Sequence, residues 1–270
     1  MSGPETPSNA VLRAAGAPRE SISKPSRKEA TRSVGQSAQG IRSAEHRRPG
    51  GGGTAEPPGR YSAMTRRPVP GWFVVPAQPV KRQRPPAGRG WVREIKHDGY
   101  RVLVRRDGAV VRIYSRSAIN WTDRFSAIAA VAATLEAHSF TIDGEAVVIG
   151  PDGVAQFDEL RQRNGAKRAI LYGFDLIELN GVDLRRRPLL ERKTALADLL
   201  GETKAGIMLN DHITADGDMV FAHACRLGAE GIVSKQVDSS YRSGPHPAWV
   251  KTKNPASIAV QRERSQNWNR

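Results

Sequence analysis

Short alternating segments joined by tight turns are the feature that most constrains what this chain can fold into. Tyr100, Val102 and Val104 alternate with two arginines and a leucine, and an Asp-Gly pair at 107–108 separates them from a second apolar segment. Alternation with a period of two is typical of a strand with one buried face. An Asp-Gly pair between two such segments is a strong hairpin signal, so the sequence predicts a β-hairpin here.

The remaining elements are mixed along the chain and do not alternate regularly. Strands are expected at 140–149 with an interruption at Asp143-Gly144, and at 169–179, 207–213, 231–234 and 249–253. Helices are expected at 122–137 with Thr122 as the cap, and at 157–163, 189–200 and 218–227. Hairpins mixed with helices favour an α+β domain built on antiparallel sheets.

The first 65 residues have a different composition from the rest of the chain. They are rich in Gly, Pro, Ser and Arg and nearly lack aromatic residues. Such a segment buries too little apolar surface to offset the loss of chain entropy. We therefore expect a disordered basic tail at 1–65, a folded domain at 66–256, and a short polar tail at 257–270.

The charge of the chain indicates its class of partner. The formal net charge is +15 and the sequence pI is about 10.6. A balance this basic points to a polyanion, with nucleic acid before an anionic membrane surface. Because no apolar run approaches the ~18 residues of a membrane span, we expect no membrane partner. The single cysteine, Cys225, excludes an intrachain disulfide and a cysteine zinc cluster.

Lys96 is the first candidate for chemistry. It stands at the end of an expected strand, between Glu94 and Asp98 and just before the glycine turn at Gly99. A lysine that is held near cations and partly desolvated can lose its proton near neutral pH and act as a nucleophile. A surface lysine beside a turn has the same local pattern, so this motif gains meaning only together with others.

Further motifs follow Lys96 in a fixed order. They are Ser115-Arg116-Ser117, Asp143-Gly144-Glu145, Phe174-Asp175, the segment 230–235 and the segment 249–253. Their kind and order resemble the nucleotidyltransferase motifs of the ATP-dependent DNA ligases, a superfamily shared with RNA ligases and mRNA capping enzymes. The resemblance covers about residues 70–256 and is strongest to the ligase domain of the bacterial end-joining ligases. It implies an ATP-grasp-like adenylation domain of antiparallel sheets flanked by helices.

The resemblance also implies a reaction. Lys96 would attack the α-phosphate of ATP, expel pyrophosphate and form lysyl-AMP. AMP would then pass to the 5′-phosphate of a DNA nick, and the 3′-hydroxyl would displace it to close the backbone. Each step moves negative charge at phosphorus, so cationic side chains and Mg²⁺ or Mn²⁺ suit it. DNA repair by end joining and recombination are the implied settings.

The resemblance assigns roles residue by residue. Glu94 would read the adenine amino group, Phe174 would stack on the base, and the arginines would bind ribose and phosphates. Lys251 and Lys253 share one face of a strand and would meet the triphosphate. The implied nucleotide-binding residues are Glu94, Ile95, Arg101, Arg116, Glu145, Phe174, Lys251 and Lys253, and the implied metal ligands are Glu145 and Glu230.

Two alternative functions stay open at this point. One is an RNA ligase or capping nucleotidyltransferase, and the other is a DNA-binding remnant without turnover. The related ligases usually carry an oligonucleotide-binding barrel after the last motif. Because only 17 residues follow Lys253, we expect no barrel in this sequence. The implied partners are nicked or broken double-stranded DNA and an end-binding protein or separate barrel-domain protein in trans, in the bacterial cytoplasm at the nucleoid.

Overall fold

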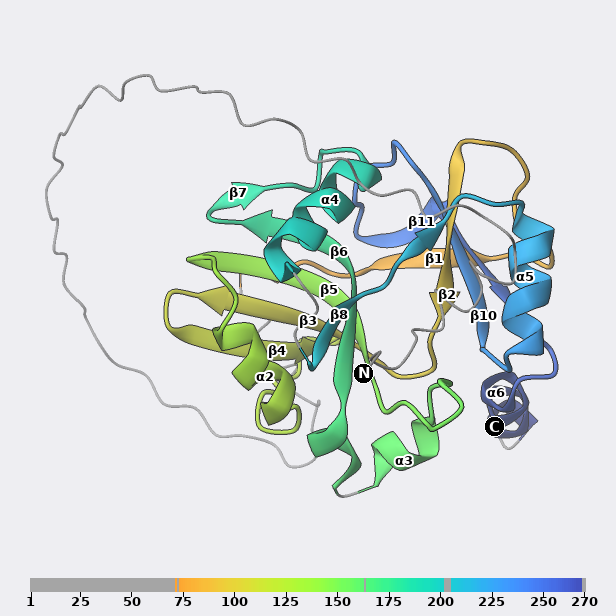
Figure 1. The fold of residues 1–270 in the computed structure, drawn as a ribbon, viewed down its shortest axis with the longest axis horizontal. Helices are drawn as coiled ribbons and strands as arrows, with labels where there is room; N and C mark the ends of the chain where they lie inside the picture. The colour runs from red at the N-terminus through yellow and green to blue at the C-terminus, as the bar shows by residue number, and fades with distance from the viewer. Residues whose placement is uncertain (1–70, 72, 163, 202–204, 269–270) are drawn as a thin grey trace, which may run out of the picture. The chain divides into compact units, whose positions relative to one another are not determined.

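Two β-sheets form the framework of the protein. The computed structural model describes residues 71, 73–162, 164–201 and 205–268, so the tail expected at 1–65 lies outside the described residues. The first sheet has the order β1-β11-β10-β2-β9 (Figure 1). Its strands are β1 (Ala77–Lys81), β2 (Trp91–Lys96), β9 (His212–Ile213), β10 (Gly231–Gln236) and β11 (Gly244–Lys253).

The second sheet contains the predicted hairpin. Its order is β4-β3-β5-β6-β7, and β8 pairs with β6. Its strands are β3 (Tyr100–Asp107), β4 (Val110–Ser115), β5 (Ser139–Val147), β6 (Ile170–Leu179), β7 (Val182–Asp183) and β8 (Ile207–Leu209). Most neighbours are antiparallel, as expected, but β1 runs parallel to β11 and β8 runs parallel to β6. The α+β prediction is confirmed, while the sheets are mixed and not purely antiparallel.

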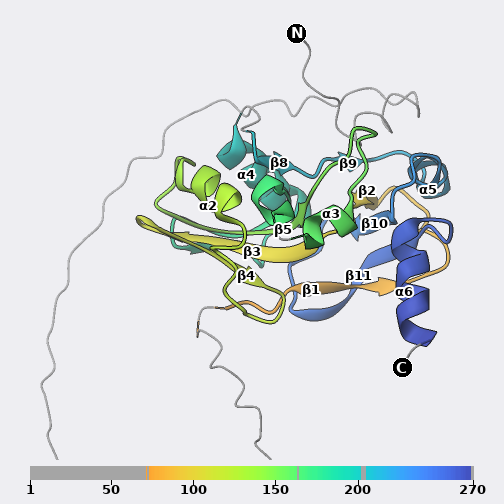
Figure 2. The same ribbon diagram turned by 90° about the horizontal axis from the view of Figure 1, so that it is seen from below.

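The helices cover the outer faces of the sheets. They are α2 (Ser126–Ala133), α3 (Phe157–Arg161), α4 (Leu189–Leu200), α5 (Gly217–Arg226) and α6 (Ile258–Trp268), with a 3₁₀ turn at Gly165–Arg168. Figure 2 shows α2 and α4 on one side of the second sheet, and α5 and α6 next to the first. Helix α4 has the expected bounds and ends at Gly201, which has φ +60°. None of the described helices is long and apolar enough to cross a membrane.

Helix α2 is shorter than predicted, and the predicted cap is wrong. The helix begins at Ser126, and Thr122 lies in the preceding turn. The Thr122 hydroxyl accepts a hydrogen bond from the Ile113 backbone N–H at 2.9 Å and donates to Asn120 Oδ1 at 2.6 Å. A cap-like residue that finds partners in a neighbouring strand does not start a helix.

Three strand predictions are corrected by pairing between distant segments. Strand β5 runs through Asp143-Gly144 without a break, although its register against β6 shifts there. Gly144 is needed for close approach, since a Cβ would lie 2.8 Å from the Tyr172 carbonyl oxygen. Residues 207–213 divide into β8 and β9, which belong to different sheets. Strand β1 was not predicted, and β11 begins five residues before the expected strand.

The expected polar tail contains a helix. Residues 258–268 form α6, which lies beside the segment that joins α5 to β10 (Figures 1 and 2). Val260 is 6% exposed, and the Arg262 guanidinium donates to the Asp98 carboxylate and lies 4.3 Å from the Phe157 ring centroid. These long-range contacts stabilise a segment whose composition alone predicts no helix.

Three apolar clusters hold the fold together. One lies under α2 and α4 and includes Phe125, Phe140 and Leu196, and a smaller one lies under α5. The third joins the two sheets through Leu103 of β3 and Trp249 of β11, together with Val92, Ile177, Leu189 and Tyr241. Each large side chain buried in this way contributes roughly 1.5–3 kcal/mol. The third cluster therefore fixes the two sheets against each other where the functional motifs meet.

Candidate active site

A cavity of about 420 Å³ opens between the two sheets. Its walls combine β2, β10 and β11 of the first sheet with β3, β5 and β6 of the second. Eight of the residues expected from the sequence line it, namely Glu94, Ile95, Lys96, Arg101, Arg116, Glu145, Phe174 and Lys251. The other two, Glu230 and Lys253, lie outside its lining but join it through an ion-pair chain that starts at Lys96.

Lys96 closes β2 at the mouth of this cavity. Its Nζ lies 2.6 Å from Oε2 of Glu230, and Oε1 of the same carboxylate lies 3.1 Å from Nζ of Lys253. The Lys96 side chain is 23% exposed, whereas that of Glu230 is 6% exposed. Lys96 and Glu230 also line a second cavity of about 830 Å³ beside α6, so the amine can be approached from two sides.

Two glycines allow the strands to meet at Lys96. A Cβ on Gly99 would lie 2.3 Å from the Ala146 carbonyl oxygen, and a Cβ on Gly231 would lie 2.1 Å from the Thr252 carbonyl oxygen. Gly231 also has φ +145°, which side chains with a Cβ rarely adopt. The glycine after Asp98 therefore serves close packing against β5, where the sequence analysis assigned a turn.

Glu145 lies half-buried in the cavity wall on β5. Removal from water raises its pKa to about 7, an effect that Lys96 and Arg101 reduce and that Glu230 and Asp143 increase. Within the part of the chain that the structure describes, no group of three or more His, Cys, Asp or Glu side chains could hold a metal. Two carboxylates suit Mg²⁺, which usually keeps several waters and takes its remaining ligands from substrate phosphates.

Arg101 and Phe174 form one wall of the cavity. Nε and Nη2 of Arg101 donate to the two oxygens of Asp143 at 2.9 and 2.7 Å, and Nη1 donates to the Ala77 carbonyl. The guanidinium carbon lies 5.1 Å from the centroid of the Phe174 ring. Three N–H groups of Arg101 are thus used by the protein, so its remaining donors are the ones left for a ligand.

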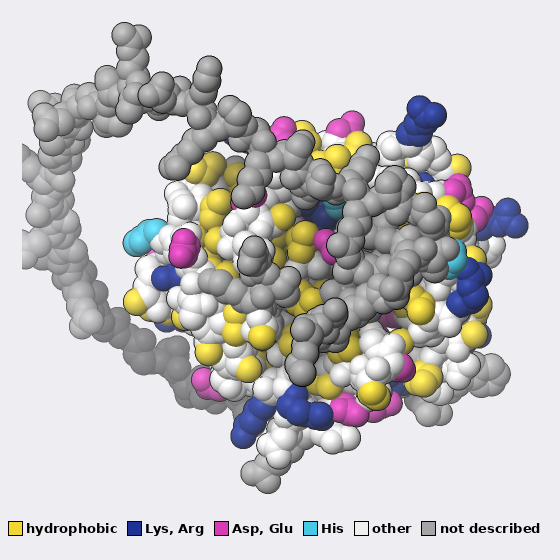
Figure 3. Space-filling view, in the orientation of Figure 1, with side chains coloured by type: hydrophobic (Ala, Val, Ile, Leu, Met, Phe, Trp, Pro, Cys, Tyr) yellow, Lys and Arg dark blue, Asp and Glu magenta, His cyan; other side chains and the backbone are white. Residues whose placement is uncertain are grey.

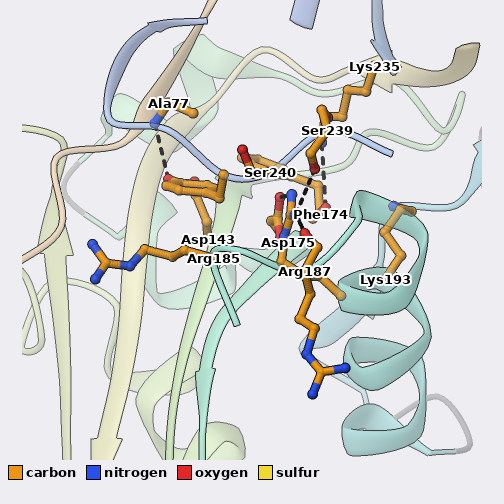
Figure 4. A network of polar contacts seen from close by, with 12 residues as sticks. Ala77, Asp143, Phe174, Asp175, Arg185, Arg187, Lys193, Lys235, Ser239 and Ser240 are labelled. Atoms are coloured by element: carbon orange, nitrogen blue, oxygen red, sulfur yellow. Dashed lines mark hydrogen bonds and ion pairs between the residues drawn. The ribbon is translucent and has the colours of Figure 1, made fainter. Parts of the chain in front are cut away.

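A buried polar network supports this wall (Figure 4). The Tyr241 hydroxyl donates to Asp143 and accepts from the Ala77 backbone N–H. In α4, Arg192 donates to both oxygens of Asp175 at 2.7 and 2.9 Å and to the Ser239 carbonyl. Buried polar groups with satisfied partners of this kind specify one arrangement of the strands.

Glu94 lies at the deep end of the cavity and is 1% exposed. Its Oε1 is 2.8 Å from Nζ of Lys193, and its Oε2 is 2.7 Å from Nζ of Lys235. Burial favours the neutral acid, but the two ammonium groups outweigh this and hold the pKa of Glu94 below its ordinary value. The Lys235 ammonium also lies 4.1 Å from the Trp249 ring centroid and 4.5 Å from that of Phe174.

The remaining cations lie nearer the surface. Arg116 is exposed at the rim after β4, and Lys251 is half-buried on β11. Burial, together with the charges of Lys253 and Lys96, lowers the pKa of Lys251. Lys253 behaves oppositely: although burial opposes it, contact with Glu263 and Glu230 raises its pKa.

Helix α6 contributes two further contacts at this end. Glu263 Oε2 lies 2.6 Å from the Lys253 ammonium, and Arg262 pairs with Asp98. Asp98 follows Lys96 by two residues in the chain, and Lys253 pairs with the same Glu230 carboxylate as Lys96 does. Helix α6, which follows the last motif, therefore contributes charged partners to residues of the site.

Sequence reasoning missed several residues around Glu94. Lys193 shares a face of α4 with the buried Leu189, Leu196 and Leu200, and an apolar helix face interrupted by a lysine is the signal that could have found it. His97, the neighbour of Lys96, was not among the expected site residues. It is buried, stacks on the Tyr172 ring with centroids 4.1 Å apart, and has Nε2 3.1 Å from Asn210 Oδ1.

On the part of the face that is left uncovered in Figure 3, the Lys and Arg groups lie apart, most of them near the edge, with Asp and Glu groups among them. Exposed cations on the described chain include Arg112 in β4, Arg116 just after it, and Arg186 and Arg187 before α4. Their spread suits contact with an extended anion more than with a compact one.

The two-sheet fold and a strand-end lysine beside a buried carboxylate define the nucleotidyltransferase class. A family model, described as "ATP dependent DNA ligase domain", matches residues 77–253, and the chain belongs to this family. The family that the motif order predicted is thereby confirmed. The match begins at β1 and ends at Lys253 in β11, so it spans both sheets.

Individual relatives agree with this assignment. The multifunctional non-homologous end joining protein LigD of Pseudomonas aeruginosa is 34% identical over 203 residues, which is 74% of this chain and 24% of that protein. A probable DNA ligase of Streptomyces griseus is 33% identical over 181 residues, 59% of this chain and 35% of that protein. This chain thus spans about a quarter to a third of the length of these relatives.

Solved structures show the same fold. A mycobacterial DNA ligase D complexed with ATP and MES has a TM-score of 0.59 at 30% identity, covering 67% of this chain and 60% of that one. The ligase domain of LigD from M. tuberculosis has a TM-score of 0.58 at 31% identity, covering 67% and 59%. The adenylation-domain fold that the resemblance implied is confirmed.

Proposed function

We propose that this domain is the adenylating part of an ATP-dependent DNA ligase that acts in DNA end joining. The observation that carries the proposal is Lys96, whose amine lies at the mouth of a nucleotide-sized cavity 2.6 Å from the Glu230 carboxylate. A nucleophile and a proton acceptor within hydrogen-bond reach are the first requirement for covalent catalysis.

In the first step Lys96 Nζ attacks the α-phosphorus of ATP. An N–P bond forms, the bond to the bridging oxygen of the β-phosphate breaks, and pyrophosphate leaves with that electron pair. Glu230 lies in position to take the proton that Nζ loses. The product is AMP held on Lys96 as a phosphoramidate.

In the next steps a DNA 5′-phosphate oxygen attacks the same phosphorus and releases Lys96. The 3′-hydroxyl of the neighbouring strand then attacks the 5′-phosphorus and expels AMP. In the last displacement the 3′-hydroxyl gives its proton to a base as the new O–P bond forms and the bond to AMP breaks. Both displacements build negative charge on oxygens around phosphorus, so cationic side chains at the site lower the barrier. Lys251 and Lys253 are the described lysines on β11 that lie near Lys96.

A divalent cation fits the two carboxylates of this end. Glu145 and Glu230 would hold Mg²⁺ or Mn²⁺, which when bound supplies positive charge against the phosphate oxygens. Glu145 must be ionised to do this, and its raised pKa of about 7 places that ionisation within the physiological range. Glu230 is shared between Lys96 and Lys253, and its carboxylate would serve a bound cation in place of these two ammonium groups.

The nucleoside would lie at the inner end of the cavity. Phe174 presents a ring for base stacking, and Glu94 presents carboxylate oxygens to an exocyclic amine. Ile95 lies on β2 between Glu94 and Lys96, and its side chain points into the cluster under α5. Its part in binding would therefore come from its backbone. Arg101 and Arg116 would meet the ribose and the phosphates.

The DNA partner is supported by charge and by the relatives' names. A formal net charge of +15 favours salt-dependent binding to a polyanion without sequence preference. Relatives of this chain are named as end-joining proteins and DNA ligases. We propose nicked or broken duplex DNA at the bacterial nucleoid as the substrate, with an end-binding protein or a barrel-domain protein as a partner in trans.

Covalent labelling tests the proposal. Purified protein is incubated with Mg²⁺ and ATP labelled at the α-phosphate, and label that survives denaturation is measured. We expect label on the wild type, none on Lys96→Ala or Lys96→Arg, and wild-type label on Lys167→Ala, which changes an exposed lysine far along the chain. Equal label on Lys96→Ala would overturn the assignment of the nucleophile.

Substrate class is tested separately with pre-adenylated nicks. Sealing of an adenylated DNA nick, with little sealing of the same nick in RNA, is the expected result. Preference for the RNA nick would favour an RNA ligase. Both assays are repeated with an added end-binding protein or barrel-domain protein. A chain that then binds DNA in a salt-dependent way, but is neither labelled nor able to seal, would be a remnant that keeps only DNA binding.

A further inference from the structure

The deep end of the cavity contains three charges that are all removed from water. Side-chain exposures are 2% for Glu94, 3% for Lys193 and 2% for Lys235. Two of these residues, Glu94 and Lys235, line the cavity, whereas Lys193 does not. Any effect of Lys193 on a bound nucleotide must therefore be transmitted through Glu94 or through the backbone that Lys193 contacts.

Lys193 links Glu94 to Asn210, which lies between β8 and β9. Its ammonium donates to Glu94 Oε1 and to the Asn210 carbonyl, each at 2.8 Å. The Asn210 amide in turn donates to the Ile95 carbonyl at 3.2 Å, next to Glu94 in β2. Lys193 on α4 thus fixes both the carboxylate and the strand that carries it. Figure 4 shows Lys193 extending from α4, with Lys235 on a separate strand.

The surroundings of Glu94 determine what it offers to a ligand. Each carboxylate oxygen accepts one ammonium proton and keeps acceptor capacity for another donor. The other titratable groups facing it are His212 of β9 and His97, and burial lowers the pKa of each to about 4, so both are neutral at physiological pH. An ionised carboxylate here presents acceptors only, which match the exocyclic amine of a 6-aminopurine and oppose the carbonyl of a 6-oxopurine.

We propose that Lys193 is the positioning residue that gives the cavity its preference for a 6-aminopurine nucleotide over a 6-oxopurine nucleotide, by holding Glu94 ionised and in place. The inference rests on the proposed function for the identity of the cavity's ligand. Without Lys193, burial acts on Glu94 against one ammonium instead of two, and a protonated Glu94 can donate to a 6-oxo group. Selectivity should then fall even though no residue that touches the ligand has changed.

Binding of ATP and of inosine triphosphate tests the inference without any covalent step. Both affinities are measured by calorimetry in the absence of divalent cations for the wild type, Lys193→Met, Lys193→Arg and Glu191→Gln, an exposed change on the same helix. We expect the wild type to prefer ATP and Lys193→Met to lose about tenfold or more of that preference, the scale of an unmatched buried polar group. Lys193→Arg and Glu191→Gln should keep it within about threefold.

The pH profile separates positioning from a merely structural role. In Lys193→Met the ratio of the affinities for ATP and inosine triphosphate should rise from pH 5 to pH 8 as Glu94 ionises, while the wild-type ratio stays flat. The ratio is used because Glu145 lines the same cavity and titrates near pH 7, which affects both triphosphates alike. If thermal unfolding shows that Lys193→Met is not folded, Lys193→Gln is used in its place, because glutamine keeps a hydrogen-bond donor without the charge. An unchanged ATP preference with a flat profile in the folded variant would overturn the inference, and so would a wild type that does not prefer ATP.

The proposed function is read out independently. Labelling of wild-type Lys96 by ATP tests the enzyme, while the calorimetric ratio tests Lys193. A wild type that prefers ATP but forms no lysyl-AMP would count against the function and leave the role of Lys193 standing. If the wild type is labelled but Lys193→Met is as selective as the wild type, the proposed function stands and the role of Lys193 is overturned.

Discussion

The two ends of the cavity hold their charges in different ways. At the inner end, Glu94, Lys193 and Lys235 are each no more than 3% exposed and have no alternative partner in water. At the outer end, Lys96 is 23% exposed, Glu230 6% and Lys253 14%, and the chain of ion pairs ends in water at Glu263, which is 54% exposed. Exposed ion pairs exchange partners at little cost, whereas buried ones do not. In the proposed function, the inner end would recognise the nucleoside and the outer end would exchange ligands during the reaction.

Removing the inner carboxylate should break this contrast most severely. Glu94→Gln leaves two buried ammonium groups facing a neutral amide, so we expect a loss of about 3–5 kcal/mol in the free energy of unfolding, measured with urea. Burial already lowers the pKa of Lys235 to about 8. A lysine whose pKa is lower in the folded state than the unfolded value of about 10.4 destabilises the fold while it is charged. This penalty shrinks as the pH rises and the folded lysine loses its proton. The deficit should therefore shrink between pH 6 and pH 9, and a loss below about 1 kcal/mol would contradict the buried triad.

Removing the outer carboxylate should affect the reaction more than the fold. Glu230→Gln takes from Lys96 both its proton acceptor and one proposed metal ligand, so we expect the rate of lysyl-AMP formation to fall about 10²-fold or more. Because Lys96 keeps 23% exposure and can be hydrated, stability should change far less than in Glu94→Gln. Labelling time courses and urea unfolding of the same preparation check the two halves. A variant as unstable as Glu94→Gln would show that this end is not exchangeable.

Glu145 belongs to the outer end, where the charges of Lys96 and Glu230 act on it, and its titration sharpens the comparison. Its folded pKa of about 7 exceeds the ordinary 4.5, so the native state binds this proton more tightly and stability declines as pH rises through that window. Glu145→Gln should raise the free energy of unfolding at pH 8 by roughly 1–3 kcal/mol and change it little at pH 5. The same variant should slow adenylation at pH 8, where the wild type is ionised. Equal stability effects at both pH values would contradict the raised pKa.

The smallest effect is expected where α6 meets Lys253. Glu263→Gln removes a carboxylate that a triphosphate must displace, so the KM for ATP in lysyl-AMP formation should fall about two- to fivefold with little change in stability. Gln261→Glu places an added carboxylate on the same helix, two residues away, and serves as a charge control. An increase in KM for Glu263→Gln would mean that Glu263 assists Lys253 and does not compete for it.

Local patterns were sufficient where the neighbours along the chain decide the structure. The Asp107-Gly108 turn and the alternating residues before it predicted the β3–β4 hairpin, and the helix predicted at 189–200 has the bounds of α4. The order of the motifs identified the family and the eight residues that line the cavity. These signals are short in range or fixed in spacing, so they can be read from the sequence without knowledge of the fold.

Local patterns failed where a distant strand or helix supplied the partner. Thr122 looked like a helix cap but bonds to β4, and Asp143-Gly144 looked like a break but lies within β5, where Asp143 accepts from Arg101. Residues 258–268 looked like a polar tail, yet Arg262 and Glu263 find Asp98 and Lys253. At Asp143-Gly144 and at 258–268, an ion pair or strand ladder between segments far apart in sequence outweighs the local preference, and at Thr122 a hydrogen bond to the preceding strand does so.

The sequence by itself determined that this chain is an α+β member of the DNA ligase family with Lys96 as the lysine of its first motif, because those facts depend on residue type and spacing. Only the tertiary structure decided which charges lie in water and which do not. Burial depends on what packs against a side chain from every direction: it places Lys193 against Glu94 from another helix, raises the pKa of Glu145 from both sheets, and gives Lys253 a partner from the last helix.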